Sequence, residues 1–144
     1  MPNWCMNHVS VSSSDPATIN RFREAVEKTG EKLGLFSQLC PIQKPDESDA
    51  RINWGTKWDV HGVALINNNS TVVDIEFFTA WSPPIEFYQH LTKQGYHVEA
   101  MYYEGGVGFC GYWDSEKGDV EMDLTDGTAI PSDIQEMFGL ENEE

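Results

Sequence analysis

Alternation of apolar and polar residues in several short segments is the feature that most constrains the fold of this chain. Residues 6–12 and 71–79 place side chains of the same kind at every second position. That period is typical of a strand with one buried face. Similar patterns predict further strands at 60–66, 96–104, 107–113 and 119–124. The chain therefore has the material for one sheet.

Helical spacing separates these strands at two places. Ser14 or Asp15 can cap a first helix that ends at Gly30, and Ser82, followed by two prolines, can cap a second. A short third helix is predicted at 132–138. The predicted order is strand, helix, strand, strand, helix, strand, followed by a hairpin and the short helix.

The first six elements of this order match a ferredoxin-like arrangement, in which both helices cover one face of the sheet. We therefore predict an α+β fold, a ferredoxin-like βαββαβ two-layer sandwich with an additional C-terminal β-hairpin and short helix. The 144 residues have the length of one domain. We expect that domain to span 1–144, with a long ordered loop at about 34–59 and an acidic tail at 140–144.

Charge is the strongest feature of the composition. Nine Lys and Arg residues face 24 Asp and Glu residues, a formal net charge of −15. Such a chain is repelled by nucleic-acid phosphates and by anionic membranes, so we expect a partner with a basic surface and no direct nucleic-acid or membrane binding. Cys5, Cys40 and Cys110 are odd in number and far apart, which favours reduced thiols in a cytoplasm. The N-terminus lacks a signal-peptide pattern.

The same strand alternation indicates an acidic sheet face. If the apolar residues at 73–77 and 120–124 face the helices, the intervening carboxylates point outward and lie close together. These candidate protein-binding residues are Asp74, Glu76, Asp119, Glu121 and Asp123. A dense negative patch of this kind suits a basic protein surface. The alternative is an acidic face that only interacts with solvent.

A second candidate site is rich in tryptophan. Its predicted ligand-binding residues are Trp54, Thr56, Lys57, Trp58, Asp59 and Trp81. Indole rings and a cation would suit a planar anionic ligand such as a nucleotide. The alternative is that the tryptophans fix the long loop to the core.

Other motifs give no catalytic, metal or cofactor site. Gly106, Gly108 and Gly111 have G-x-G-x-x-G spacing, but no helix follows, so we expect a bulge or a close backbone approach there instead of nucleotide binding. Cys5 and His8 have C-x-x-H spacing without a second ligand pair. No residue stands out as an acid, base or nucleophile, so an enzyme is the least favoured class.

Several phrases spread along the chain resemble one known family. They are residues 1–5 (MPNWC), 53–59 (NWGTKWD), 79–84 (TAWSPP) and the glycine-rich segment from Tyr103 to Gly111. They resemble the YubB-like proteins of bacteriophages and conjugative plasmids, and Met6 is the one departure. The resemblance implies a ferredoxin-like domain acting in the cytoplasm of a bacterial host, and it implies no catalytic residues.

These observations lead to two functional hypotheses. The first is an acidic phage or plasmid accessory protein that binds a host protein through its negative surface. Inhibition of a defence system of the CRISPR or restriction type is the sharper version of this hypothesis. The second is a small-ligand module that binds or sequesters a nucleotide-like molecule at the tryptophan site. The sequence gives no oligomeric state.

Overall fold

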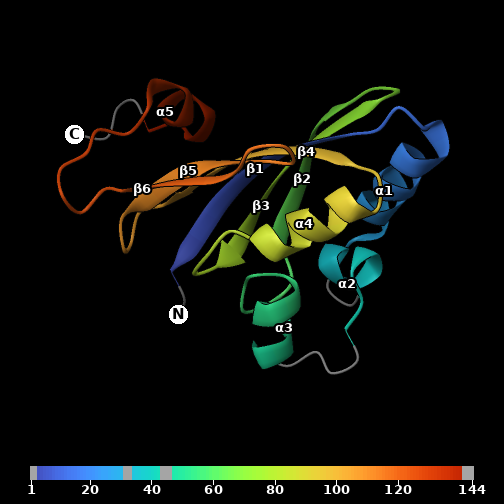
Figure 1. The fold of residues 1–144 in the computed structure, drawn as a ribbon, viewed down its shortest axis with the longest axis horizontal. Coiled ribbons are helices and arrows are strands. Elements are labelled where there is room, and N and C mark those ends of the chain that lie inside the picture. The colour runs from blue at the N-terminus through green and yellow to red at the C-terminus, as the bar shows by residue number, and fades with distance from the viewer. Residues whose placement is uncertain (1–2, 31–33, 43–46, 141–144) are drawn as a thin grey trace.

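The computed structural model describes residues 3–30, 34–42 and 47–140. Their strands form one sheet of six antiparallel strands in the order β2-β3-β1-β4-β5-β6 (Figure 1). The strands are β1 (Trp4–Ser12), β2 (His61–Asn68), β3 (Val72–Ala80), β4 (His97–Glu104), β5 (Phe109–Asp114) and β6 (Gly118–Asp123). The helices are α1 (Pro16–Lys28), α2 (Leu35–Leu39), α3 (Glu47–Asn53), α4 (Ile85–Lys93) and α5 (Ser132–Phe138). The tail predicted at 140–144 lies outside the described residues except for Leu140.

The first four strands have the order β2-β3-β1-β4, and α1 and α4 connect them in the predicted sequence. This confirms the predicted α+β, ferredoxin-like fold. The β5–β6 hairpin continues the sheet from β4, because every residue from Glu99 to Glu104 pairs with β5. Two short helices, α2 and α3, lie within the long connection between α1 and β2.

Of the two long helices, α1 begins at a side-chain cap and α4 does not. The Asp15 carboxylate accepts a hydrogen bond from the backbone N–H of Ala17 and caps α1. The predicted cap at Ser82 is wrong, because its hydroxyl donates to the carbonyl of Gly55 instead, 2.7 Å away. Helix α4 begins after Pro84 without a side-chain cap.

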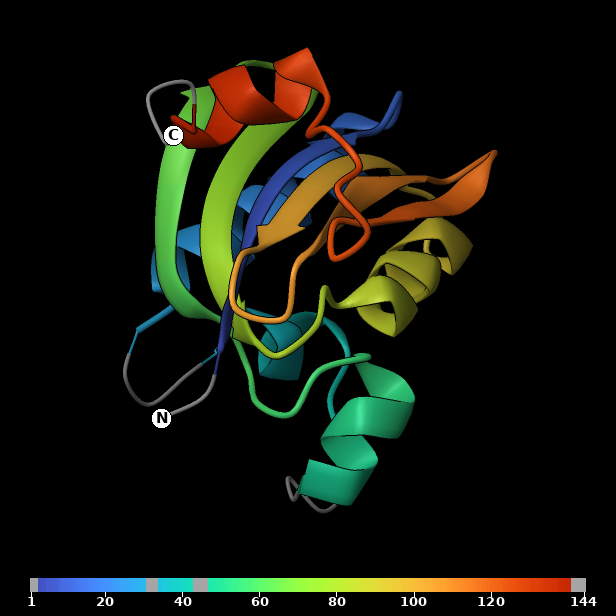
Figure 2. The same ribbon diagram turned by 90° about the vertical axis from the view of Figure 1, so that its left-hand side faces the viewer.

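The core lies between α1, α4 and one face of the sheet, which we call the α4 face. Val9, Ile75 and Val98 contribute from the strands, and Phe22 and Leu91 contribute from the helices. Helix α5 lies on the opposite side of the sheet, the α5 face (Figures 1 and 2). The sheet therefore has helices on both faces, and α5 leaves part of the second face uncovered.

Candidate functional site

The tryptophan site is divided between the core and the surface. Trp54 is buried and donates a 2.8 Å hydrogen bond from its indole nitrogen to the carbonyl of Cys40. Thr56 is also buried and donates to the carbonyl of Ala80 at 2.8 Å. Asp59 accepts hydrogen bonds from the backbone N–H groups of Phe36 and Ser37, 2.9 Å each, at the start of α2. These side chains hold the α1–β2 connection against the core.

The other members of this set remain at the surface. Trp58 and Trp81 are 41% and 42% exposed. The Lys57 ammonium lies 4.7 Å from the centre of the Trp58 ring, a cation–π contact. The Trp4 ring approaches Trp58 at 6.4 Å and stacks on His61 at 4.8 Å. A ligand site at Trp58 and Trp81 stays a prediction, without the support of Trp54, Thr56 and Asp59.

The predicted acidic face is wrong, because its two halves lie on opposite faces of the sheet. Asp74 and Glu76 lie on the α5 face, since they pair with Ser10 and His8. Following the row that starts at buried Ile75 through β1, β4 and β5 leads to Asp119. The alternating residues of β6 that share the α4 face are Asp119, Glu121 and Asp123.

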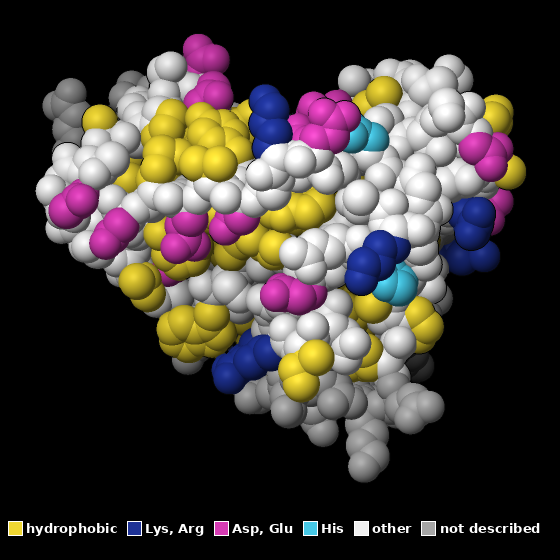
Figure 3. All heavy atoms as spheres, viewed as in Figure 1, with side chains coloured by type: hydrophobic (Ala, Val, Ile, Leu, Met, Phe, Trp, Pro, Cys, Tyr) yellow, Lys and Arg dark blue, Asp and Glu magenta, His cyan; other side chains and the backbone are white. Residues whose placement is uncertain are grey.

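The acidic residues of β6 still form a dense stripe. All three are exposed, and Figure 3 shows acidic side chains in a line on the β5–β6 side of the molecule. Burial and the neighbouring charges of Asp119 and Asp123 raise the pKa of Glu121. The stripe therefore concentrates negative charge, but on the face away from Asp74.

The α5 face contains a groove of about 510 Å³. Strands β1, β3, β4, β5 and β6 form its floor, and Asp133 and Met137 of α5 form one wall. We call it the carboxylate groove. Its polar lining residues are His8, Ser10, Asp74, Glu99, Tyr112, Asp114, Lys117 and Asp133, and its apolar ones include Met101, Val120 and Met137. At the top of Figure 3, acidic, basic and histidine side chains meet between α5 and the β2–β3 hairpin.

Carboxylates dominate the charge of this groove. Asp74, Glu99, Asp114 and Asp133 face a single lysine, Lys117. The Oδ1 atom of Asp74 is buried and has no hydrogen-bond partner among the described residues. A buried acceptor of this kind destabilises a protein by about 1–3 kcal/mol. The groove thus contains a polar atom whose partner the described chain does not supply.

His8 and Glu76 occupy the next row of the same face. Their Nδ1 and Oε2 atoms lie 3.0 Å apart, and the histidine side chain is 14% exposed while that of Glu76 is 37% exposed. This contact gives the Glu76 carboxylate a hydrogen-bond partner. Glu76 is one of the protein-binding residues predicted from the sequence. Asp74 is thus the acidic residue of β3 whose carboxylate still lacks a donor at one oxygen.

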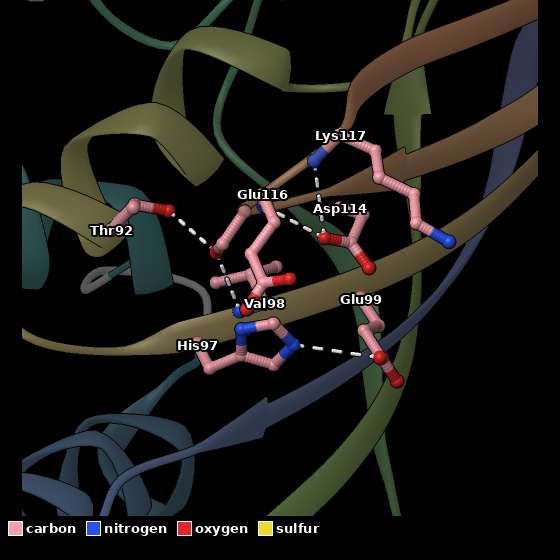
Figure 4. A network of polar contacts seen from close by, with 8 residues as sticks. Thr92, His97, Val98, Glu99, Asp114, Glu116 and Lys117 are labelled. Carbon is pink, nitrogen blue, oxygen red and sulfur yellow. Dashed lines mark hydrogen bonds and ion pairs between the residues drawn. The ribbon is translucent and has the colours of Figure 1, made fainter.

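A tight turn holds the rim of the groove in place (Figure 4). The Ser115 hydroxyl accepts from the N–H of Val98 at 2.8 Å and contacts the Thr92 hydroxyl at 2.7 Å. Asp114 Oδ1 accepts from the N–H of Glu116 at 2.7 Å. That bond, a second from the Lys117 N–H, and nearby positive charge hold the pKa of Asp114 below its usual value. Asp114 is therefore an ionised, fixed carboxylate.

His97, Glu99 and Asp114 form a group that could hold a divalent cation. Their ligand atoms all lie within 4.8 Å of one another. An imidazole and two carboxylates are suitable ligands for such an ion, with water completing the coordination. All three residues come from the neighbouring strands β4 and β5, where Glu99 pairs directly with Asp114.

Glu99, Asp114 and Asp133 line the groove together with Asp74, and none of the three was predicted from the sequence. The alternation at 96–104 could have placed Glu99 on the outer face of β4, because its side chain points away from those of the apolar residues on either side of it. Asp114 and Asp133 gave no such signal. They reach the groove through the β4–β5 register and the return of α5 across the sheet.

The fold and the groove together define an α+β domain of the ferredoxin-like class with a carboxylate-rich sheet face. The chain belongs to the family described as the ferredoxin-like domain in Api92-like protein, whose model matches residues 53–141. This stretch includes every strand except β1, together with α4 and α5. Comparisons with curated proteins and with solved structures find no match. Within the described ranges, no helix has the length and apolar character needed to cross a bilayer.

The unsatisfied atom of Asp74 gives a stability prediction. Replacing Asp74 with valine is expected to raise the free energy of unfolding by about 1 kcal/mol, because it removes a buried acceptor without a donor. Urea denaturation measures this change. The matched control is Asp119→Val, which should destabilise the protein, because Asp119 accepts a 2.6 Å hydrogen bond from the Tyr102 hydroxyl. A loss of stability in Asp74→Val as large as in the control would show that Asp74 has a partner.

Proposed function

We propose that the protein is a non-catalytic binding module that takes a basic segment of a partner protein into the carboxylate groove. The observation that carries this proposal is the buried, unpartnered Oδ1 atom of Asp74 on the floor of a groove rich in carboxylates. Proteins rarely retain such an atom without a use, because its desolvation is costly. A cationic group of a partner that enters the groove would supply this donor once the Asp74 side chain turns Oδ1 outward, because the atom is covered in the unbound structure.

The charge of the whole chain supports the same choice of partner. A net charge of −15 attracts a basic protein over a distance of several ångströms and speeds the encounter. The same charge repels nucleic acids and anionic membranes. The acidic stripe on β6 would contribute to this attraction from the other face, without forming the docking site.

The finer identity of the partner is also part of the proposal. The resemblance of the chain to the YubB-like proteins supports an accessory role for a phage or plasmid in the cytoplasm of a bacterium. The partner would then be a host protein with a basic surface, and an enzyme of a defence system such as CRISPR or restriction fits that description. Inhibition would follow if the groove covered a basic segment that the enzyme needs for nucleic acid.

A charge-neutralising comparison tests the groove against the rest of the acidic surface. The groove variant is Glu99→Gln, Asp114→Asn and Asp133→Asn, and the control is Asp119→Asn, Glu121→Gln and Asp123→Asn on the opposite face. Both variants change the net charge equally and retain oxygen acceptors at every site. Binding of a fluorescein-labelled, arginine-rich peptide is measured by fluorescence anisotropy at about 50 and 300 mM salt, since screening increases between them.

We expect the groove variant to weaken peptide binding at least about tenfold and the control by about twofold or less, because direct charge contacts contribute more than distant charges. Wild-type binding should weaken at the higher salt concentration. Equal losses in both variants would mean that only net charge matters. A greater loss in the control would move the site to β6, and either outcome would contradict the proposal.

A further inference from the structure

Asp74 begins one of two neighbouring rows of side chains on the α5 face. One row is polar and runs from Asp74 through Ser10 and Glu99 to Asp114. The row beside it continues from His8 to Met101, Tyr112 and Val120. Met137 of α5 lines the same groove. The groove therefore has a carboxylate side and a largely apolar side, next to one another.

This pairing fits the two halves of an arginine side chain. Arginine has an apolar stem that packs on apolar surface and a charged end that stays with polar partners. Its guanidinium is planar, has five N–H donors and is more weakly hydrated than an ammonium group. A half-enclosed carboxylate that lacks a donor is therefore satisfied at a lower desolvation cost by arginine than by lysine.

In the described part of the sheet, neither residue that pairs with Asp74 on a neighbouring strand is a cation. On neighbouring strands it pairs with Ser10 of β1 and Asn67 of β2, and on its own strand Val72 and Glu76 share its face. Lys117 belongs to the β5–β6 turn, and no salt bridge joins it to a groove carboxylate among the described residues. None of these neighbours gives Asp74 a cationic partner, and the residue lines the groove, so a cation that enters the groove can pair with its carboxylate once the side chain turns.

We propose that the carboxylate groove is specific for an arginine residue of an extended partner segment, which lies along the row of Met101 and Tyr112 and whose guanidinium pairs with the Asp74 carboxylate after that side chain turns its covered Oδ1 atom toward the groove. This inference rests on the proposed function and specifies its partner. A groove of about 510 Å³ has the volume of a site for a molecule much larger than one guanidinium. Glu99, Asp114 and Asp133 line the remaining length, where a second basic residue of the same segment fits.

The test uses peptides of one sequence whose central residue is arginine, lysine or citrulline. Citrulline retains the shape of arginine without its charge. Affinities for the full chain are measured by isothermal titration calorimetry with EDTA present, so that no metal ion occupies His97, Glu99 and Asp114. Agmatine, a free guanidinium compound, forms a further arm. The variant is Asp74→Asn, which preserves the size of the side chain, with folding checked by circular dichroism.

We expect the arginine peptide to bind about fivefold more tightly than the lysine peptide and at least about tenfold more tightly than the citrulline peptide. In Asp74→Asn the ratio between arginine and lysine should fall to about one. Amide chemical shifts of the wild-type protein should change on β3, β1 and β4 when the arginine peptide is added. This mapping does not depend on any variant.

The outcomes separate this inference from the proposed function. If Asp74→Asn retains the arginine preference while the groove variant still loses binding, the groove function stands and the arginine site is wrong. If no basic peptide binds the wild-type protein, the proposed function itself is wrong. Agmatine binding as tightly as the peptide would overturn a protein segment as the occupant. The titration is also repeated with Zn²⁺ in place of EDTA. If the arginine peptide binds only when Zn²⁺ is present, direct recognition by Asp74 is wrong.

Discussion

Replacing Trp54 with alanine should destabilise the protein by about 3–5 kcal/mol, the range for removing a large buried aromatic side chain. Trp54 is 3% exposed, and its ring lies 5.6 Å from that of Phe36. Phe36 in turn contacts Phe77 of β3 and Phe87 of α4. The substitution would leave a cavity between the α1–β2 connection and the core, and it would leave the Cys40 carbonyl without its indole donor. Urea denaturation followed by circular dichroism measures the loss.

The matched control is Trp58→Ala, four residues further along the chain. Trp58 is 41% exposed and contacts Lys57 and Trp4 at the surface. We expect this variant to cost about 1 kcal/mol or less, because exposed cation–π and aromatic contacts are weak. Similar losses in the two variants would contradict the division of the tryptophan set into buried and surface members. A loss of about 1 kcal/mol or less in Trp54→Ala would also contradict this division, because a buried tryptophan should contribute more.

The fold could be predicted from the sequence because its signals are local. The alternation at 6–12 belongs to β1, and the short helix expected at 132–138 coincides with α5. Strand order then follows from a small set of allowed connections between these elements. The predicted cap at Ser82 failed because its hydroxyl donates to the carbonyl of Gly55, a residue distant in the sequence. Capping residues compete for partners that the local sequence does not reveal.

The acidic face could not be predicted in the same way. Alternation separates the two sides of a strand, but it does not say which side faces a given helix. In β6, Val120 and Met122 face the side of the sheet that carries α5, so their neighbour Glu121 faces the α4 side. A single acidic face would require the apolar residues of every strand to face α1 and α4. That requirement fails where a later helix covers the second face.

The groove depends on contacts between segments that are distant in the chain. Asp74, Glu99 and Asp133 come from β3, β4 and α5. None of them belongs to a motif, and in a chain with 24 acidic residues a single carboxylate carries little information. What distinguishes Asp74 is the missing partner of one oxygen atom, which is a property of the packed structure.

Substituting Gly111 with valine should cost about 3 kcal/mol or more, because overpacking of a well-packed site is destabilising. Gly111 pairs with Tyr102 of β4 and with Glu121 of β6. An added Cβ would lie 2.5 Å from the Tyr102 hydroxyl oxygen and closer still to the carbonyl of Val120. The absence of a side chain lets the Tyr102 ring cross β5, so that its hydroxyl donates a 2.6 Å hydrogen bond to Asp119. This is a close approach to the backbone, one of the two alternatives that the glycine spacing predicted, and a tyrosine ring makes it.

The measurement compares the midpoints of urea denaturation with those of Gly30→Val, the control for adding the same side chain. Among the residues that the structure describes, none has an atom within 4 Å of a Cβ built at Gly30, so this control should change the free energy of unfolding by about 0.5 kcal/mol or less. A second variant, Gly111→Val combined with Tyr102→Phe, removes the hydroxyl that the new side chain would meet. It should recover part of the loss, because the two residues are in contact and their effects are not additive. If Tyr102→Phe recovers none of the stability, the Val120 carbonyl and the ring carbon of residue 102, which would lie 2.7 Å from the added Cβ, account for the clash, and the predicted contribution of the hydroxyl is wrong.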